Sequence, residues 1–179
     1  MSLFLLDRDG VVTVNRATNV KTAGDIELLP GVPEAIARLN GAGFDVAICT
    51  NQPEVARGVI SQEQQDAIHE ALRQMLGARG AKVDMILCCG YDHKSPRRKP
   101  SGGMLGEALA RYRAVAAETP FVGDQADDLK AAFHVGCKRV LVRTGLGRKT
   151  LENGLPQYLS PVAVHDDLAA VVDARLTGR

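Results

Sequence analysis

Short apolar runs alternate with longer amphipathic segments along most of this 179-residue chain, and this alternation most constrains its fold. The apolar runs predict strands at residues 3–6, 44–49, 83–89, 120–122, 139–142 and 162–164. Helical spacing predicts five helices. The first opens at 30–33 and ends near 41, and the second starts at 61. The third covers about 103–112, the fourth about 126–135, and the fifth starts at 166. Strands separated by helices need crossover connections, which favour parallel pairing. We therefore predict one α/β domain over residues 1–179, with a doubly wound parallel sheet.

Composition excludes several classes of partner. The formal charge is +1 and tryptophan is absent, so neither a basic field nor a base-stacking surface favours nucleic acid. No apolar stretch approaches membrane-spanning length, and Asp7 interrupts the first apolar run too early for a signal peptide. The four cysteines lie in or near apolar runs, as reduced core residues do. We expect a cytoplasmic monomer that binds neither nucleic acid nor membrane.

The segment Asp7-Arg8-Asp9-Gly10 directly follows the first apolar run. Two carboxylates separated by one residue lie on the same side of an extended chain. Like charges held this close repel unless a divalent cation or a basic group offsets them. The pair therefore indicates a bound hard metal, an acid/base couple or both. A turn that merely ends the strand is the alternative interpretation.

Further chemical groups follow the other predicted strands. In parallel sheets of this kind, ligands bind outside the carboxyl ends of the strands. Carboxylates, a hydroxyl, amides and cations meet there, and together they suit a phosphoryl group bound with Mg²⁺. The residues concerned are Asp7, Asp9, Thr50, Asn51, Gln52, Lys94, Arg97, Arg98, Lys99, Asp124, Asp127 and Asp128.

These motifs resemble those of the haloacid dehalogenase (HAD) superfamily of phosphatases, and within it the heptose bisphosphate phosphatases and their histidinol-phosphate phosphatase relatives. The resemblance runs from about residue 5 to residue 145. It rests on the segments Asp7–Gly10, Thr50–Gln52, Ala56–Gly58, Arg98–Pro100, Gly123–Asp128 and Val142–Gly145. It implies a Rossmann-like fold. The chain shows no large insertion between the motifs where capped members place a lid domain, so we expect no large cap.

The resemblance also implies catalytic roles. Asp7 would attack phosphorus and form an aspartyl-phosphate, and Asp9 would act as general acid and then base. Mg²⁺ would be held by Asp7, the Asp9 backbone carbonyl and Asp124. Thr50 and Lys99 would bind the phosphoryl oxygens. Asp128 would lie behind these groups and orient metal-bound water or Lys99.

For the substrate, the resemblance implies a small sugar phosphate, D-glycero-D-manno-heptose 1,7-bisphosphate, which would lose its 7-phosphate during synthesis of lipopolysaccharide core precursors. Histidinol phosphate or another small phosphomonoester is the alternative. Without a cap, loops must recognise the substrate. We expect Asn15, Asn51, Gln52 and Arg98 to contact it.

Two departures from the family pattern stand out. Pro53 follows Thr50–Gln52 where relatives have serine, and Ser95 and Arg97 replace the second cysteine pair of a zinc loop. Cys88, Cys89 and His93 remain, but adjacent cysteines on a strand point to opposite faces. Because a closed structural zinc site takes four ligands, we predict that structural zinc is absent.

Other features allow plainer interpretations. His69 and His134 fall within helical patterns and read as ordinary helix residues, and residues 145–147 read as a loop because the longer dinucleotide fingerprint is missing.

A phosphoacceptor signalling module is the rival function, since receiver domains share this fold class and an acidic cluster. Their phosphorylated aspartate lies on a middle strand, however, not after the first. A phosphate-binding protein without activity is a third possibility, which the intact motif set disfavours.

Overall fold

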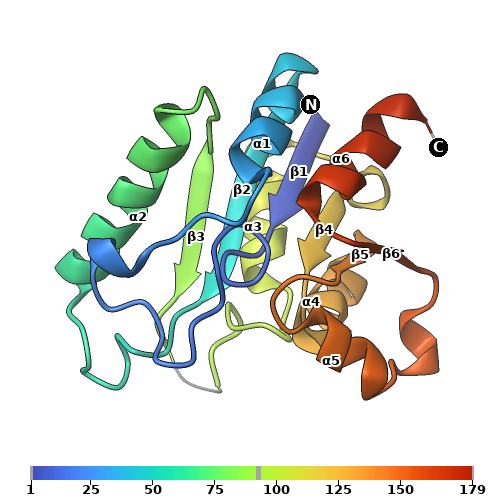
Figure 1. Cartoon of the computed structure of the whole chain (residues 1–179). Coiled ribbons are helices and arrows are strands. Elements are labelled where there is room, and N and C mark those ends of the chain that lie inside the picture. The colour runs from blue at the N-terminus through green and yellow to red at the C-terminus, as the bar shows by residue number, and fades with distance from the viewer. Residues whose placement is uncertain (1, 92–93, 179) are drawn as a thin grey trace.

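The computed structural model describes residues 2–91 and 94–178 and shows one six-stranded parallel sheet in the order β3-β2-β1-β4-β5-β6 (Figure 1). The strands are β1 (Ser2–Leu6), β2 (Phe44–Asn51), β3 (Met85–Cys89), β4 (Pro120–Gly123), β5 (Lys138–Val142) and β6 (Val162–His165). The predicted doubly wound α/β architecture is confirmed. Between β1 and α1 the chain forms a loop with one short 3₁₀ turn (Ala23–Asp25), and no cap domain interrupts the described residues.

Helices cover both faces of the sheet because the strand side chains alternate. Phe4 and Leu6 of β1 join the core beneath α1 (Val32–Gly41), α2 (Gln62–Gly77) and α6 (Leu168–Thr177). Leu3 and Leu5 point to the opposite core, beneath α3 (Gly103–Tyr112) and α4 (Ala126–Val135). Both faces of β1 are therefore buried, and the strand delivers its last residues to a fixed place.

The predicted start of α2 is confirmed in detail. Ser61 Oγ accepts from the backbone N–H of Gln64 at 3.2 Å, and Gln64 Oε1 accepts from the Ser61 N–H at 2.7 Å. This reciprocal pair satisfies two otherwise unpaired N–H groups of the first turn. Along residues 2–91 and 94–178, every helix is too short or too polar to cross a lipid bilayer.

Several predicted boundaries differ from the structure by one or two residues. β3 begins at Met85 rather than at residue 83. Just before it, the Asp84 N–H donates to the Val46 carbonyl at 2.8 Å, but the Val46 N–H is bound by the Asp84 carboxylate, at 3.0 Å, instead of by a backbone carbonyl. Residues 145 and 146 form the predicted loop, and α5 (Gly147–Glu152), which was not predicted, begins directly after them. Gly147 is required there, since a Cβ would lie 1.7 Å from the Val142 carbonyl oxygen.

Candidate active site

The catalytic candidates gather where the strand order reverses. β1 lies between β2 and β4, and such a switch point opens a crevice at the carboxyl ends of the strands. Asp7 follows β1, Asp124 follows β4, and Thr50 lies near the end of β2. A pocket of about 220 Å³ opens there, and eight of the predicted site residues line it: Asp7, Asp9, Asn15, Thr50, Asn51, Arg98, Lys99 and Asp128.

Lys99 connects two carboxylates at the floor of this pocket. Its Nζ lies 2.7 Å from Asp7 Oδ1 and 2.7 Å from Asp128 Oδ1, and the lysine is only 4% exposed. Burial alone would lower the pKa of Lys99, but the charges of Asp128 and then Asp7 outweigh burial and raise it. The side chain is therefore a permanent ammonium, suited to binding phosphoryl oxygens.

Three carboxylates crowd around this one ammonium. Oxygens of Asp7, Asp124 and Asp128 all lie within 4.8 Å of one another. Burial, and then the charge of Asp128, raise the pKa of Asp124 to about 7, and the same two causes raise that of Asp7 well above its ordinary value. Three carboxylates against one ammonium leave an excess of two negative charges, which one divalent cation would cancel.

Asp124 offers the clearest sign of a metal ligand. It is fully buried, and its Oδ2 accepts from the Leu146 N–H at 2.8 Å. Its Oδ1 is enclosed and has no hydrogen-bond partner among residues 2–91 and 94–178. A buried carboxylate oxygen without a partner is costly, and Mg²⁺ prefers such oxygen ligands. The donor set therefore fits Mg²⁺.

The start of α4 holds Asp128 in place. Asp128 Oδ2 accepts from the backbone N–H groups of Asp124 at 3.2 Å and Gln125 at 3.1 Å, which leaves Oδ1 for Lys99. Gly123 makes this approach possible, because a Cβ there would lie 2.2 Å from the Asp128 Cβ. Asp128 thus caps a helix and positions the lysine at the same time.

The three polar residues at the end of β2 and just beyond it organise their neighbours. The Asn51 side chain donates to the Lys99 carbonyl at 2.9 Å and accepts from the Lys99 N–H at 3.0 Å. Gln52 Nε2 donates to Thr50 Oγ1 at 2.9 Å and to Asp9 Oδ2 at 2.7 Å. Asn51 also lines the pocket, whereas the Gln52 side chain is buried behind Thr50 and Asp9.

The side of the pocket away from the carboxylates carries Asn15, Asn19 and Arg98. Arg98 Nη1 is enclosed without a hydrogen-bond partner among the described residues, so its charge is available to an anion. Asn19 has a left-handed backbone (φ 57°) and donates to the buried carboxylate of Glu54. The sequence predicted residues 15–19 as a substrate-reading loop, and Asn19 does line the pocket, whereas Glu54 was not predicted.

The rest of the basic loop turns elsewhere. Arg97 forms an ion pair with Glu107 on α3, at 3.1 Å, and Lys94 is exposed to solvent. His93, part of the same predicted loop, lies outside the described residues. Among the four basic residues 94 and 97–99, only Arg98 and Lys99 line the pocket.

Residues 144–146 cover Asp124, a contact that the sequence alone did not reveal. Thr144 Oγ1 donates to the Gly10 carbonyl at 2.7 Å, and Leu146 donates its N–H to Asp124. A Cβ at Gly145 would lie 2.2 Å from Asp124 Oδ2, so only glycine allows this approach. The only available signal was the Val142–Gly145 segment, which follows a strand end.

The cysteines remain thiols. All four are free, and Cys49, Cys89 and Cys137 are buried. Burial raises the pKa of Cys88 to about 12, which disfavours the thiolate that zinc would need. The predicted absence of zinc remains a prediction, since His93 is not described.

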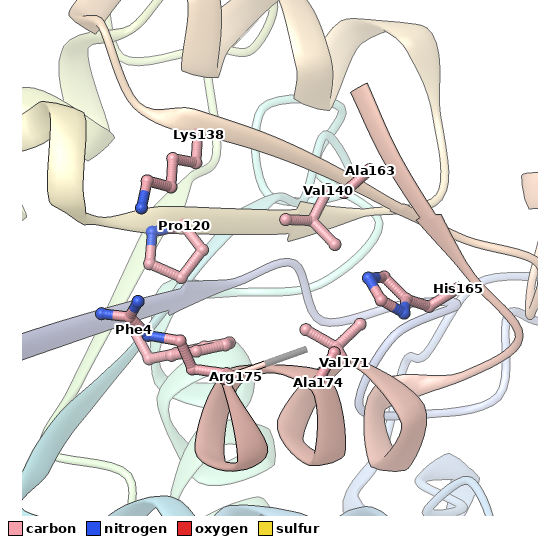
Figure 2. Close-up of a pocket in the computed structure, with 10 residues that line it drawn as sticks. Phe4, Pro120, Lys138, Val140, Ala163, His165, Val171, Ala174 and Arg175 are labelled. Atoms are coloured by element: carbon pink, nitrogen blue, oxygen red, sulfur yellow. The ribbon is translucent and has the colours of Figure 1, made fainter. Parts of the chain in front are cut away.

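A larger hollow of about 390 Å³ lies elsewhere, between α6 and strands β4, β5 and β6 (Figure 2). Phe4, Val140 and Val171 give it an apolar wall, and Lys138, His165 and Arg175 add nitrogen-bearing side chains. No carboxylate lines it among the described residues. This hollow therefore lacks the oxygen ligands of a magnesium site.

Comparisons with known proteins agree with the geometry. The HAD-hydrolase-like family model matches residues 96–171. Two proteins named D-glycero-beta-D-manno-heptose-1,7-bisphosphate 7-phosphatase are similar over nearly their whole length. The one from Pseudomonas putida is 40% identical (96% of this chain, 97% of the relative), and that from Bordetella bronchiseptica is 42% identical (98% of each).

Solved structures give the same result. The crystal structure of D,D-heptose 1,7-bisphosphate phosphatase from B. bronchiseptica, complexed with magnesium and phosphate, is 41% identical and has a TM-score of 0.93 over 100% of both chains. The enzyme of the same name from Burkholderia thailandensis is 34% identical, with a TM-score of 0.77 over 99% of both chains.

Proposed function

Because the chain belongs to the family of D-glycero-D-manno-heptose-1,7-bisphosphate 7-phosphatases among the HAD-like hydrolases, we propose that it removes the 7-phosphate of D-glycero-β-D-manno-heptose 1,7-bisphosphate. One observation carries the proposal. Buried Asp7 faces the pocket beside the unpartnered Asp124 oxygen, and Lys99 joins Asp7 to Asp128. This combination holds a nucleophile, a place for a cation and a ligand for phosphoryl oxygens within one crevice.

Mg²⁺ would be held by the carboxylates of Asp7 and Asp124 and the backbone carbonyl of Asp9. When bound, it supplies the positive charge that lets an anionic nucleophile approach an anionic phosphate. The relative crystallised with magnesium and phosphate supports this cofactor.

The side chains perform the reaction in two halves. Asp7 attacks phosphorus while Asp9 gives its proton to the leaving alkoxide oxygen, so an aspartyl-phosphate forms as the ester bond breaks. Asp9 then takes a proton from water, which attacks the same phosphorus and releases phosphate and free Asp7. Lys99 and Thr50 hold the non-bridging oxygens throughout.

Arg98 is our candidate for recognising the second phosphate of the substrate. Its guanidinium can bind phosphate through two parallel N–H groups, and part of it is unpaired in the pocket wall. Asn15 and Asn51 would accept or donate hydrogen bonds to sugar hydroxyls. In the absence of a cap, these contacts must provide the specificity.

The test is phosphate release from the heptose bisphosphate and from histidinol phosphate, measured side by side with Mg²⁺. We expect a kcat/KM at least about 10-fold higher for the bisphosphate. Asp7→Asn keeps the volume but removes the attacking charge, and should abolish turnover of both. Near wild-type turnover by Asp7→Asn would overturn the mechanism, and a preference for histidinol phosphate would overturn the substrate.

The same assay addresses the signalling alternative. A phosphoacceptor module would take up one phosphate per chain and keep it without turnover.

We further propose that the enzyme acts as a cytoplasmic monomer on a free sugar phosphate. Its formal charge of +1 offers no field for nucleic acid or anionic membranes.

A further inference from the structure

The carboxylate of Asp9 is held by four donors. Oδ1 accepts from Arg8 Nε and from Thr13 Oγ1, both at 3.1 Å. Oδ2 accepts from Arg8 Nη2 at 2.9 Å and from Gln52 Nε2 at 2.7 Å. Arg8 alone contributes two parallel bonds, the most directional way to fix a carboxylate. The side chain of Asp9 nevertheless remains 26% exposed toward the pocket.

Arg8 itself is almost completely buried, at 1% exposure. A buried guanidinium is costly unless its N–H groups are paired. The third nitrogen, Nη1, does not contact Asp9 but lies 3.4 Å from His69 Nε2, 61 positions along the chain on α2. The guanidinium thus lies between the catalytic loop and a helix that does not line the pocket.

His69 can serve Arg8 only as an acceptor. A guanidinium has donors alone, so a hydrogen bond across this 3.4 Å contact requires the tautomer with its proton on Nδ1 and its lone pair on Nε2. Gln65, fully buried one turn earlier on α2, places its Nε2 2.9 Å from the same nitrogen, so Gln65 and Arg8 share one lone pair and the 3.4 Å contact with Arg8 is the longer of the two. Burial and the charge of Arg8 lower the pKa of His69 to about 4, which keeps the ring neutral.

We propose that His69 is a positioning residue for catalysis: through Arg8 it fixes the side chain of Asp9 next to the leaving oxygen. In the acid step the proton that Asp9 carries takes the place of one of its four hydrogen bonds. This proposal rests on the proposed role of Asp9 as general acid. The chain of contacts runs from Gln65 and His69 on α2 to Arg8, and from Arg8 to Asp9. Without an acceptor on His69, Arg8 Nη1 is no longer held in place. The guanidinium, whose Nε and Nη2 align the Asp9 carboxylate, can then rotate.

The experiment compares two leaving groups. Alkyl phosphates such as the sugar substrate need protonation of the alkoxide, whereas p-nitrophenolate leaves without it. His69→Leu should lower kcat for the alkyl phosphate about 10-fold and for p-nitrophenyl phosphate less than about 2-fold, with KM unchanged. His69→Gln, which restores an acceptor at similar reach, should recover most of the loss. Gln74→Leu, exposed on the same helix, is the matched control and should change neither rate.

A double mutant separates positioning from a general structural effect. In an Asp9→Asn background, His69→Leu should change the alkyl phosphatase rate by less than about 2-fold, because the group it positions is gone. Equal losses on both substrates, or failure of His69→Gln to restore the rate, would overturn the proposal. If Asp9→Asn itself slowed both substrates equally, the proposed acid role of Asp9 would fail instead.

Discussion

The neutral, buried His69 should make the folded protein lose stability in mild acid. In the unfolded chain the imidazole binds a proton near its ordinary pKa of 6.5, whereas in the folded protein the pKa is about 4. Between these values the unfolded state binds more protons. The stabilisation is therefore fully present above pH 6.5 and is lost as pH falls towards 4.

The two pKa values set the magnitude. Linkage gives a loss of about 1.3 kcal/mol from this one residue between pH 7.5 and pH 5.5. Glutamine keeps an acceptor for Arg8 but cannot titrate. The difference in free energy of unfolding between wild type and His69→Gln should therefore shift by about 1.3 kcal/mol across this interval, at the expense of wild type.

Urea unfolding followed by circular dichroism can measure this shift, since the chain has no tryptophan to report by fluorescence. His134→Gln is the matched control, because His134 lies exposed on α4 and does not contact Arg8. It should leave the wild-type pH dependence in place. Parallel pH dependences for wild type and His69→Gln would refute the reasoning and show that the ring is not held neutral.

Three further outcomes are expected. Lys99→Met leaves Asp7 and Asp128 without their shared ammonium, so we expect no turnover and a loss of about 3–5 kcal/mol in the free energy of unfolding. The control is Lys130→Met, which removes an exposed ion pair and should cost less than about 1 kcal/mol. Urea titrations of both variants would check this, and a Lys99→Met protein as stable as wild type would contradict it. Arg98→Ala should raise KM more for the bisphosphate than for a simple monophosphate in steady-state kinetics; an equal rise would show that Arg98 does not bind the second phosphate. Metal analysis after mild chelation should find no tightly held zinc, and a stoichiometric zinc ion would disprove the argument from the substituted loop.

The sequence predicted the features whose causes are local. The alternation of apolar runs with helical segments predicted the sheet, and carboxylates placed directly after apolar runs pointed to Asp7 and Asp124. Both follow from the order of elements along the chain: strands separated by helices pair in parallel, and parallel strands end at one edge. The start of α2 at Ser61 was also predicted, and its cause, a capping pair with Gln64, is equally local.

The features that the sequence did not predict depend on distant contacts. His69 reads as an ordinary helix residue until the fold brings it to Arg8, 61 positions earlier. The late start of β3 goes with the side-chain bond from Asp84 to Val46, and the segment before α5 depends on its contact with Asp124. No periodicity records such pairings, because only the three-dimensional structure brings the partners together.

The double hydrogen bond between Asn51 and the backbone of Lys99 ties the catalytic ammonium to the sheet and not only to its own loop. The lysine is carried at the end of a long connection after β3, yet its register is set by β2, which the core holds rigidly. The stretch of loop upstream can therefore change in length and composition without displacing the ammonium. A scaffold built this way can acquire new specificities by exchanging one surface segment, which makes that segment the natural site for loop grafting from relatives with other substrates.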